Sequence, residues 1–242
     1  MPLQIGAALK SGGYRLASRT GALLTVAYLV LYAIYQTGYN ALLNALYARW
    51  GVDAMLPAVP IPVPVAAAVV AASLVGLSYL SVVAIRTFVA DERDAIPRSL
   101  YTDGVVWAVP NLFVGGLVTM LLMTVGFALL IAPGVFLLIS FVFVPVYVAV
   151  EGDDFVTAMR RSWALARGDR LPILGFVLVV VAAGLALGVV FAITNIVATL
   201  AGARIVTPLL AAVAVAPVTM YNLAAVAAAF EQLAEPPNAE AA

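Results

Sequence analysis

Arg160, Arg161, Trp163 and Arg167 lie within eight consecutive residues and are the clearest candidates for binding chemistry in this sequence. Guanidinium groups bind phosphate and carboxylate groups, and tryptophan favours the boundary between water and lipid. The chain has no histidine and no cysteine, which removes imidazole bases, thiolate nucleophiles and the common zinc and haem ligands. We therefore expect a surface that binds an anionic group or a partner, with no catalytic residue, no metal site and no cofactor.

An amphipathic helix over about residues 153–168 would position this group. Asp153 or Asp154 can cap the start of the helix, and Gly168 fits just past its end. The apolar residues recur at helical spacing and would form one stripe, made of Phe155, Met159, Trp163 and Ala166. Two roles stay open for the arginines: contact with lipid phosphates that holds the flanking spans in register, or docking of an anionic lipid headgroup or a cytoplasmic partner.

The rest of the chain is apolar enough to place this helix at a membrane. Mean hydropathy is +1.11, and 65% of the residues are hydrophobic against 10% charged, far from the balance of soluble domains. Six stretches are each long enough to cross a hydrocarbon layer about 30 Å thick. The first runs over about 21–43, and the second begins after the proline cluster at 57–64 and ends at about 85. The others run over about 105–131, 135–150, 172–198 and 205–230.

We therefore predict an all-α integral membrane protein with six transmembrane helices in three hairpins and short amphipathic cytoplasmic helices. One transmembrane domain would occupy 21–230, after an amphipathic cytoplasmic segment at 1–20 and before a disordered acidic cytoplasmic tail at 231–242. Pro133 and Gly134 favour a tight turn between the third and fourth spans. Glu151 would end the fourth span.

The distribution of basic residues predicts the orientation. With the N-terminus inside, ten Lys and Arg residues are cytoplasmic and only Arg49 and Arg204 lie outside. Basic residues near span ends are retained on the cytoplasmic side, so both termini should be cytoplasmic and the protein should reside in the cell membrane. The formal net charge is zero, so no overall field attracts nucleic acid.

Residues inside the spans suggest two further features. Gly184 and Gly188 form a GxxxG spacing, which predicts close helix contacts either within the fold or between the protomers of a homo-oligomer. Prolines inside spans kink helices and can frame a cavity, which is the basis for considering transport. The candidate cavity residues are Pro145, Pro217, Asn195 and Asn222.

One segment resembles a known family. Pro145, the run from Glu151 to Asp154, the run from Ala158 to Leu165 and the run from Gly168 to Arg170 follow the pattern P...EG...A..RSW.L..G.R. This pattern is similar to the signature of a superfamily of six-helix membrane proteins that includes the glycerophosphoryl diester phosphodiesterase membrane domain and haloarchaeal membrane proteins of unknown function. The resemblance implies a multi-pass helical fold, an archaeal source and a connection to membrane lipids. It implies no catalysis, because this sequence lacks the soluble phosphodiesterase domain.

The sequence thus favours a non-enzymatic, lipid-associated or scaffolding component of the membrane, with membrane lipids as partners. The alternative is a small-molecule or lipid transporter whose cavity is framed by kinked helices. The alternative is weakened because no span interior carries a carboxylate that could couple transport to an ion.

Overall fold

The computed structural model describes residues 3–52, 56, 59–200 and 207–234. Within them every regular element is helical. In chain order these elements are α1 (Ile5–Leu16), α2 (Arg19–Arg49), α3 (Val63–Val89), α4 (Arg98–Thr102), α5 (Val105–Leu129), α6 (Ile131–Phe141), α7 (Val144–Val146), the π-helix η1 (Tyr147–Glu151), α8 (Phe155–Ala166), α9 (Arg170–Leu200) and α10 (Thr207–Ala234).

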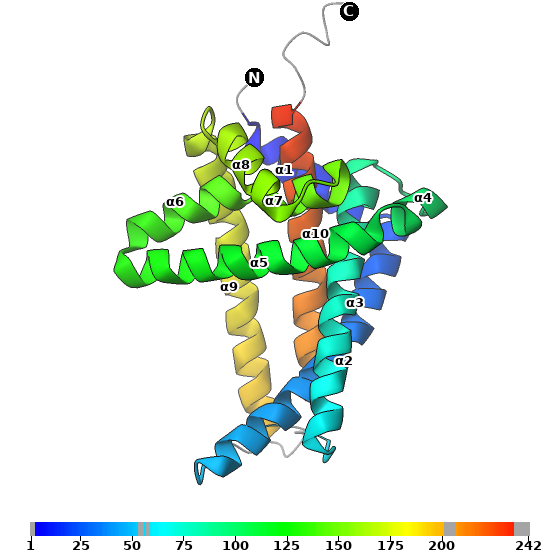
Figure 1. Cartoon of the computed structure of the whole chain (residues 1–242), viewed down its shortest axis with the longest axis vertical. Coiled ribbons are helices and arrows are strands. Elements are labelled where there is room, and N and C mark those ends of the chain that lie inside the picture. The colour runs from blue at the N-terminus through cyan, green and yellow to red at the C-terminus, as the bar shows by residue number, and fades with distance from the viewer. Residues whose placement is uncertain (1–2, 53–55, 57–58, 201–206, 235–242) are drawn as a thin grey trace, which may run out of the picture.

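Six helical stretches of the described residues are long and apolar enough to cross a membrane. They are α2, α3, α5, the stretch Ile131–Glu151, and most of α9 and α10. This agrees with the six apolar stretches in the sequence. Four of them, α2, α3, α9 and α10, run along the long axis of the molecule, and the described chain begins and ends at the same end (Figure 1).

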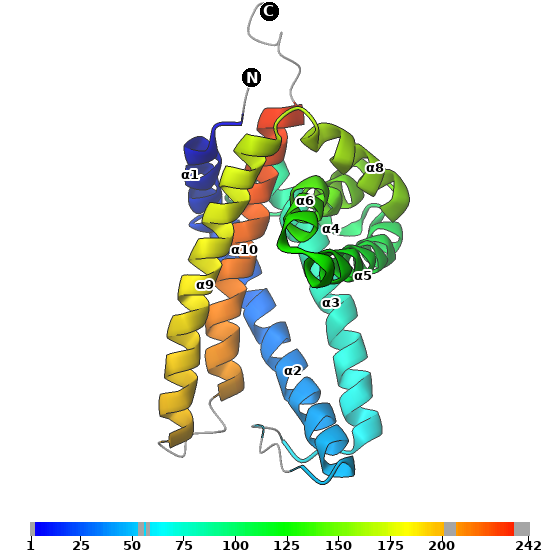
Figure 2. The same ribbon diagram turned by 90° about the vertical axis from the view of Figure 1, so that its left-hand side faces the viewer.

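The α5–α6 pair differs from the other long helices in direction. Figures 1 and 2 show α5 and α6 lying across the four long helices rather than alongside them. The predicted span 135–150 is also interrupted, because α6 ends at Phe141 and a turn at Val142 and Phe143 precedes α7 and η1. With 11 residues, α6 is about 16 Å long, roughly half the thickness of the hydrocarbon layer.

The turn between α5 and α6 lies earlier than predicted. Leu130 has an extended backbone, with φ −164° and ψ 155°, and separates the two helices. Pro133 and Gly134, the expected turn, instead form part of the first turn of α6, where a missing N–H costs nothing. A Cβ on Gly134 would lie 2.4 Å from the ring of Phe127, so this glycine is needed for the close contact of the two helices.

The core is concentrated near the end of the molecule that carries the termini. Its largest fully buried side chains include Phe143, from the turn after α6, and Ile173 and Phe176, from the first turns of α9. On the buried face of α10, small side chains let α1, α2 and α3 approach closely; they include Ala224, Ala225, Ala227, Ala228 and Ala229. The segment predicted as an N-terminal amphipathic helix therefore packs on α10, with Gly12 directly against Ala225.

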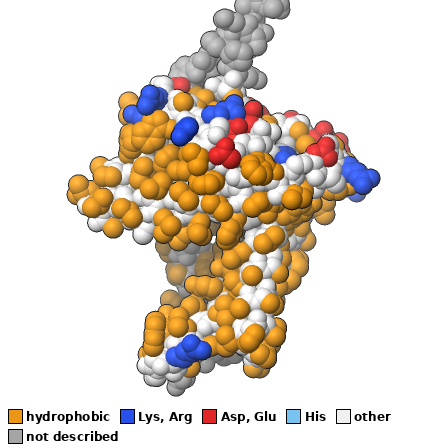
Figure 3. All heavy atoms as spheres, in the orientation of Figure 1, with side chains coloured by type: hydrophobic (Ala, Val, Ile, Leu, Met, Phe, Trp, Pro, Cys, Tyr) orange, Lys and Arg blue, Asp and Glu red, His pale blue; other side chains and the backbone are white. Residues whose placement is uncertain are grey.

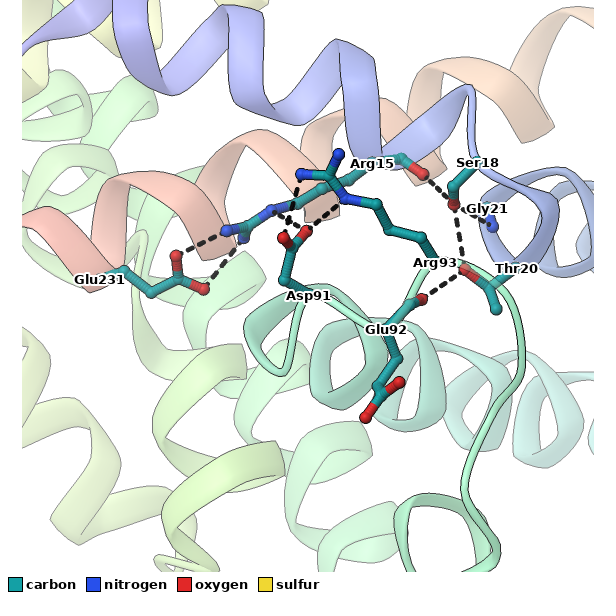
Figure 4. Close-up of polar contacts among 8 residues, drawn as sticks. All are labelled: Arg15, Ser18, Thr20, Gly21, Asp91, Glu92, Arg93 and Glu231. Carbon is teal, nitrogen blue, oxygen red and sulfur yellow. Dashed lines mark hydrogen bonds and ion pairs between the residues drawn. The ribbon is translucent and has the colours of Figure 1, made fainter.

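A partly buried ion pair joins α1 to the last turns of α10 (Figure 4). Arg15 is 7% exposed, and its two Nη atoms donate to the carboxylate of Glu231 at 3.0 and 2.6 Å. Asp91 lies 3.5 Å from the Nε of Arg15 and also accepts two hydrogen bonds from Arg93. Glu231 was expected to begin a disordered tail, but α10 continues through it to Ala234; residues 235–242 lie outside the described residues.

The GxxxG pair on α9 makes no close helix contact in the described part of the chain. A Cβ added to Gly184 or Gly188 would meet no atom within 4 Å. Both glycines instead line a small pocket of about 130 Å³ between α9 and α10. The prediction of contacts between protomers through this face stays a prediction.

Candidate functional site on α8

The predicted amphipathic helix is present as α8, which begins at Phe155 and ends at Ala166. Asp154 caps it by accepting hydrogen bonds from the backbone N–H groups of Val156 and Thr157. The Thr157 hydroxyl also donates to the Asp154 carboxylate, and these hydrogen bonds lower the pKa of Asp154 below its ordinary value. Gly168 lies just past the end of α8, as expected.

Ser162, on the buried face of α8, binds the chain where α6 ends. Its hydroxyl donates to the carbonyl of Ser140 at 2.8 Å and accepts from the N–H of Phe143 at 3.3 Å. Ser162 is 0% exposed, so water cannot replace these hydrogen bonds. Backbone groups at a buried helix end need such partners, and Ser162 supplies them at the interruption of the predicted fourth span.

Arg161 binds the segment that precedes α8. Its guanidinium lies 2.8 Å from Asp153, 3.6 Å from Glu151 and over the ring of Tyr147, 4.5 Å from the centroid. Gly152, between the two carboxylates, has a φ of +71°, a conformation that favours glycine. Arg161 therefore holds the end of η1 against the start of α8, and its charge is already partnered.

Helices α3 and α5 fix the same segment from the other side. Trp107 on α5 donates its indole N–H to the carbonyl of Gly152, and Asn111 accepts the N–H of Phe155. Arg86 on α3 donates to the carbonyls of Ala149 and Asp103. We refer to Arg86, Trp107, Asn111, Arg161 and Ser162, with the backbone groups they bind, as the α8 clamp.

Trp163 belongs to an aromatic cluster that joins α6, α8 and α9. Its ring packs against Phe136 and Phe141, with centroids 5.1 and 5.8 Å apart. The guanidinium of Arg170 lies over Phe136, 4.6 Å from the centroid. The RSW residues of the signature pattern thus bind other parts of the fold, and Trp163 also lines an open groove on α8.

Arg160 and Arg167 lie on the exposed side of α8 and line an open groove of about 590 Å³. The apolar side chains of Phe141, Met159 and Trp163 form part of the same groove. Among the described residues, the guanidinium groups of Arg160 and Arg167 have no hydrogen-bond or ion-pair partner. Figure 3 shows charged side chains gathered at this end of the molecule, over an otherwise largely apolar surface.

The predicted cavity residues do not come together in one cavity. Pro145, at the start of α7, lines a pocket of about 410 Å³ between α5 and the α6–α7 interruption. Pro217 lies within α10, 13 residues before Phe230. Phe230 packs against Phe143, in the turn after α6. Pro217 is therefore about 20 Å along the helix axis from the part of α10 that contacts this turn. Asn222 is a partly buried residue of α10, and the side chain of Asn195 lies outside the described part of the chain.

No group of three or more His, Asp, Glu or Cys side chains that could hold a metal ion occurs in the described ranges. The exposed face of α8 offers cationic groups for binding. Its two unpartnered guanidinium groups can bind phosphate oxygens, and its apolar floor can contact hydrocarbon.

Comparison with known protein families identifies the chain. A family model described as Domain of unknown function (DUF7847) matches residues 3–233, nearly the whole chain. The chain belongs to the DUF7847 family. The α8 clamp and the groove therefore lie inside the DUF7847 domain. No curated protein and no solved structure matches the chain. The resemblance to the phosphodiesterase-associated superfamily stays a prediction.

Sequence reasoning did not find the α8 clamp. It grouped Arg161 with Arg160 and Arg167 as one binding surface, whereas Arg161 is ion-paired to the preceding segment. A signal was present: Ala158, Ser162 and Ala166 recur at every fourth position, and all three are fully buried in α8. A stripe of small residues on an amphipathic helix indicates close packing, and the hydroxyl within it indicates a backbone partner.

Proposed function

We propose that this DUF7847 protein is a non-enzymatic membrane protein that binds anionic membrane lipids through Arg160 and Arg167. The observation that carries the proposal is the groove on α8. Two exposed guanidinium groups without a protein partner among the described residues flank a floor that includes Trp163. Phosphodiester oxygens match the guanidinium groups, and hydrocarbon matches the floor.

We further propose that α2, α3, α9 and α10 cross the cell membrane, with both termini and α8 on the cytoplasmic side. The distribution of basic residues supports this orientation, because Arg49 lies at the far end of α2 while most of the arginines are at the α8 end. The α5–α6 pair would lie below α8 in the cytoplasmic half of the bilayer, since α6 alone is too short to cross it. Arg160 and Arg167 would then be at the depth of the lipid phosphates.

Two other functions fit less of the molecule. A scaffolding role would place an acidic cytoplasmic protein on the same two arginines, but the apolar floor between them favours a lipid. Transport would use the pocket at Pro145, yet this pocket does not include the α10 residues expected to share it. We therefore favour lipid binding.

The test compares two double variants of the full chain in detergent micelles. Arg160→Gln with Arg167→Gln removes the groove charges, and Arg19→Gln with Arg98→Gln removes two exposed charges elsewhere. The measurement is the affinity for phosphatidylglycerol relative to phosphatidylcholine, obtained from lipid-induced shifts of the thermal unfolding midpoint.

We expect the groove variant to lose the preference for phosphatidylglycerol by roughly 10- to 30-fold, since each surface arginine contributes about 1 kcal/mol to anionic lipid binding. The control variant should keep most of the preference for phosphatidylglycerol. An equal preference in the wild type, the groove variant and the control would contradict the proposal.

A further inference from the structure

The pocket at Pro145 is a slot between α5 and the interruption that separates α6 from α7. Its volume of about 410 Å³ lies within the range of pockets that hold small ligands. Its walls are almost entirely apolar and include two methionines, Met120 and Met123, whose side chains adapt readily to a flexible ligand. A slot of this composition suits hydrocarbon rather than a polar solute.

Two residues of α5 set this slot apart from ordinary packing. A Cβ on Gly116 would meet no atom of the rest of the fold within 4 Å, so a side chain at this position would enter the open space of the slot. Thr119 also lines the slot, and its Oγ1 is buried without a hydrogen-bond partner among the described residues. A buried hydroxyl without a partner is uncommon, and it offers one donor to an oxygen of a bound molecule.

Phe141 connects this slot with the groove on α8. It is the last residue of α6, it is 8% exposed, and it lines both pockets. The two pockets therefore share one aromatic side chain, and one of them, the groove, carries the two unpartnered arginines. A single amphipathic molecule can place its anionic part at Arg160 and Arg167 and its apolar part beyond Phe141.

We infer that the slot between α5 and the α6–α7 interruption takes one acyl chain of the anionic lipid whose headgroup binds Arg160 and Arg167. This inference rests on the proposed function. The acyl chain passes the edge of Phe141, fills the space beside Gly116 and contacts Met120 and Met123. Thr119 donates its hydroxyl proton to an oxygen of the lipid backbone. The choice of lipid would then depend on the length of its acyl chains as well as on its headgroup.

The experiment uses the full chain in detergent micelles and three probes: long-chain phosphatidylglycerol, dihexanoyl phosphatidylglycerol with the same headgroup, and long-chain phosphatidylcholine. Gly116→Leu fills the slot, and Thr119→Val removes the donor at nearly constant volume. Gly184→Leu is the matched control, because Gly184 also has open space around its Cβ position but lines a different pocket on α9. Relative affinities come from native mass spectrometry.

We expect the wild type and Gly184→Leu to prefer the long-chain over the dihexanoyl phosphatidylglycerol. In Gly116→Leu this preference should fall about tenfold, while binding of the dihexanoyl lipid is retained. Thr119→Val should lower the affinity for the long-chain lipid by a smaller factor, about threefold. Loss of the long-chain preference in Gly116→Leu but not in Gly184→Leu, with the preference for phosphatidylglycerol over phosphatidylcholine intact, supports the slot.

An unchanged long-chain preference in Gly116→Leu would overturn the inference and leave the proposed function standing. A wild type that binds long-chain phosphatidylcholine as tightly as long-chain phosphatidylglycerol would overturn the proposed function. In that case, a chain preference that is still lost in Gly116→Leu would support the slot alone. Should Gly116→Leu fail to fold, Thr119→Val decides, and an unchanged long-chain affinity there overturns the inference.

Discussion

Two faces of α8 carry the same kind of side chain in different surroundings. Arg161 faces Glu151, Asp153 and the ring of Tyr147, so its charge is used within the fold. Arg160, the preceding residue, and Arg167 lie on the groove without a partner in the described part of the chain. Neighbouring residues on a helix point about 100° apart, so adjacent arginines can have a structural role and a binding role. The presence of an arginine therefore says less about function than the groups around it.

The largest effect is expected on the buried face of α8, from Ser162→Ala. This change leaves the buried N–H of Phe143 without its acceptor and the carbonyl of Ser140 without its donor. An unsatisfied buried polar group costs about 1 to 3 kcal/mol, so the thermal unfolding midpoint should fall by several degrees. Ser81→Ala in α3 is a suitable control, because the Ser81 hydroxyl bonds only within its own helix. Equal midpoints for the two variants would show that the α8 clamp does not depend on Ser162.

A smaller difference is expected between Arg161→Gln and Arg160→Gln. Arg161 is 44% exposed, so loss of its ion pairs should cost about 1 kcal/mol or less, and Arg160→Gln should change stability by less than about 0.5 kcal/mol. Lipid preference should change in the opposite order, because Arg160 lines the groove and Arg161 does not. The measurements are the unfolding midpoint and the relative affinity for phosphatidylglycerol. If Arg161→Gln lowers the lipid preference as much as Arg160→Gln, the division between the two faces is wrong.

The smallest effect concerns the cap of α8 and depends on pH. Hydrogen bonds from Thr157 and Val156 lower the pKa of Asp154 below its ordinary value of 3.8. The charged carboxylate therefore stabilises the folded state above that ordinary value, and this contribution is lost as the pH falls through the lower pKa of the folded state. The difference in unfolding midpoint between the wild type and Asp154→Asn should narrow below about pH 4. A difference that stays constant between pH 7 and pH 3 would contradict this role of the charge.

Hydrophobic periodicity and helix-end signals in the sequence were sufficient to predict α8. Asp154, the apolar stripe and Gly168 predicted the helix, because a cap and helical spacing act within one or two turns. The direction of α5 and α6 was not predictable in this way. It depends on Leu130, on the interruption at Val142 and Phe143, and on bonds from Trp107 and Asn111 to residues more than 40 positions away.

The amino-acid sequence by itself determined that the chain is helical and that six stretches are apolar enough for a membrane, because both properties follow from local composition and spacing. Only the tertiary structure decided which arginines are paired, where the third and fourth apolar stretches lie, and that Phe141 lines both the slot and the groove. These properties depend on contacts between residues far apart in the chain, such as those of Ser162 with Ser140 and of Arg15 with Glu231. A hydrogen bond or an ion pair forms only where the fold brings its two partners together, and composition does not encode that distance.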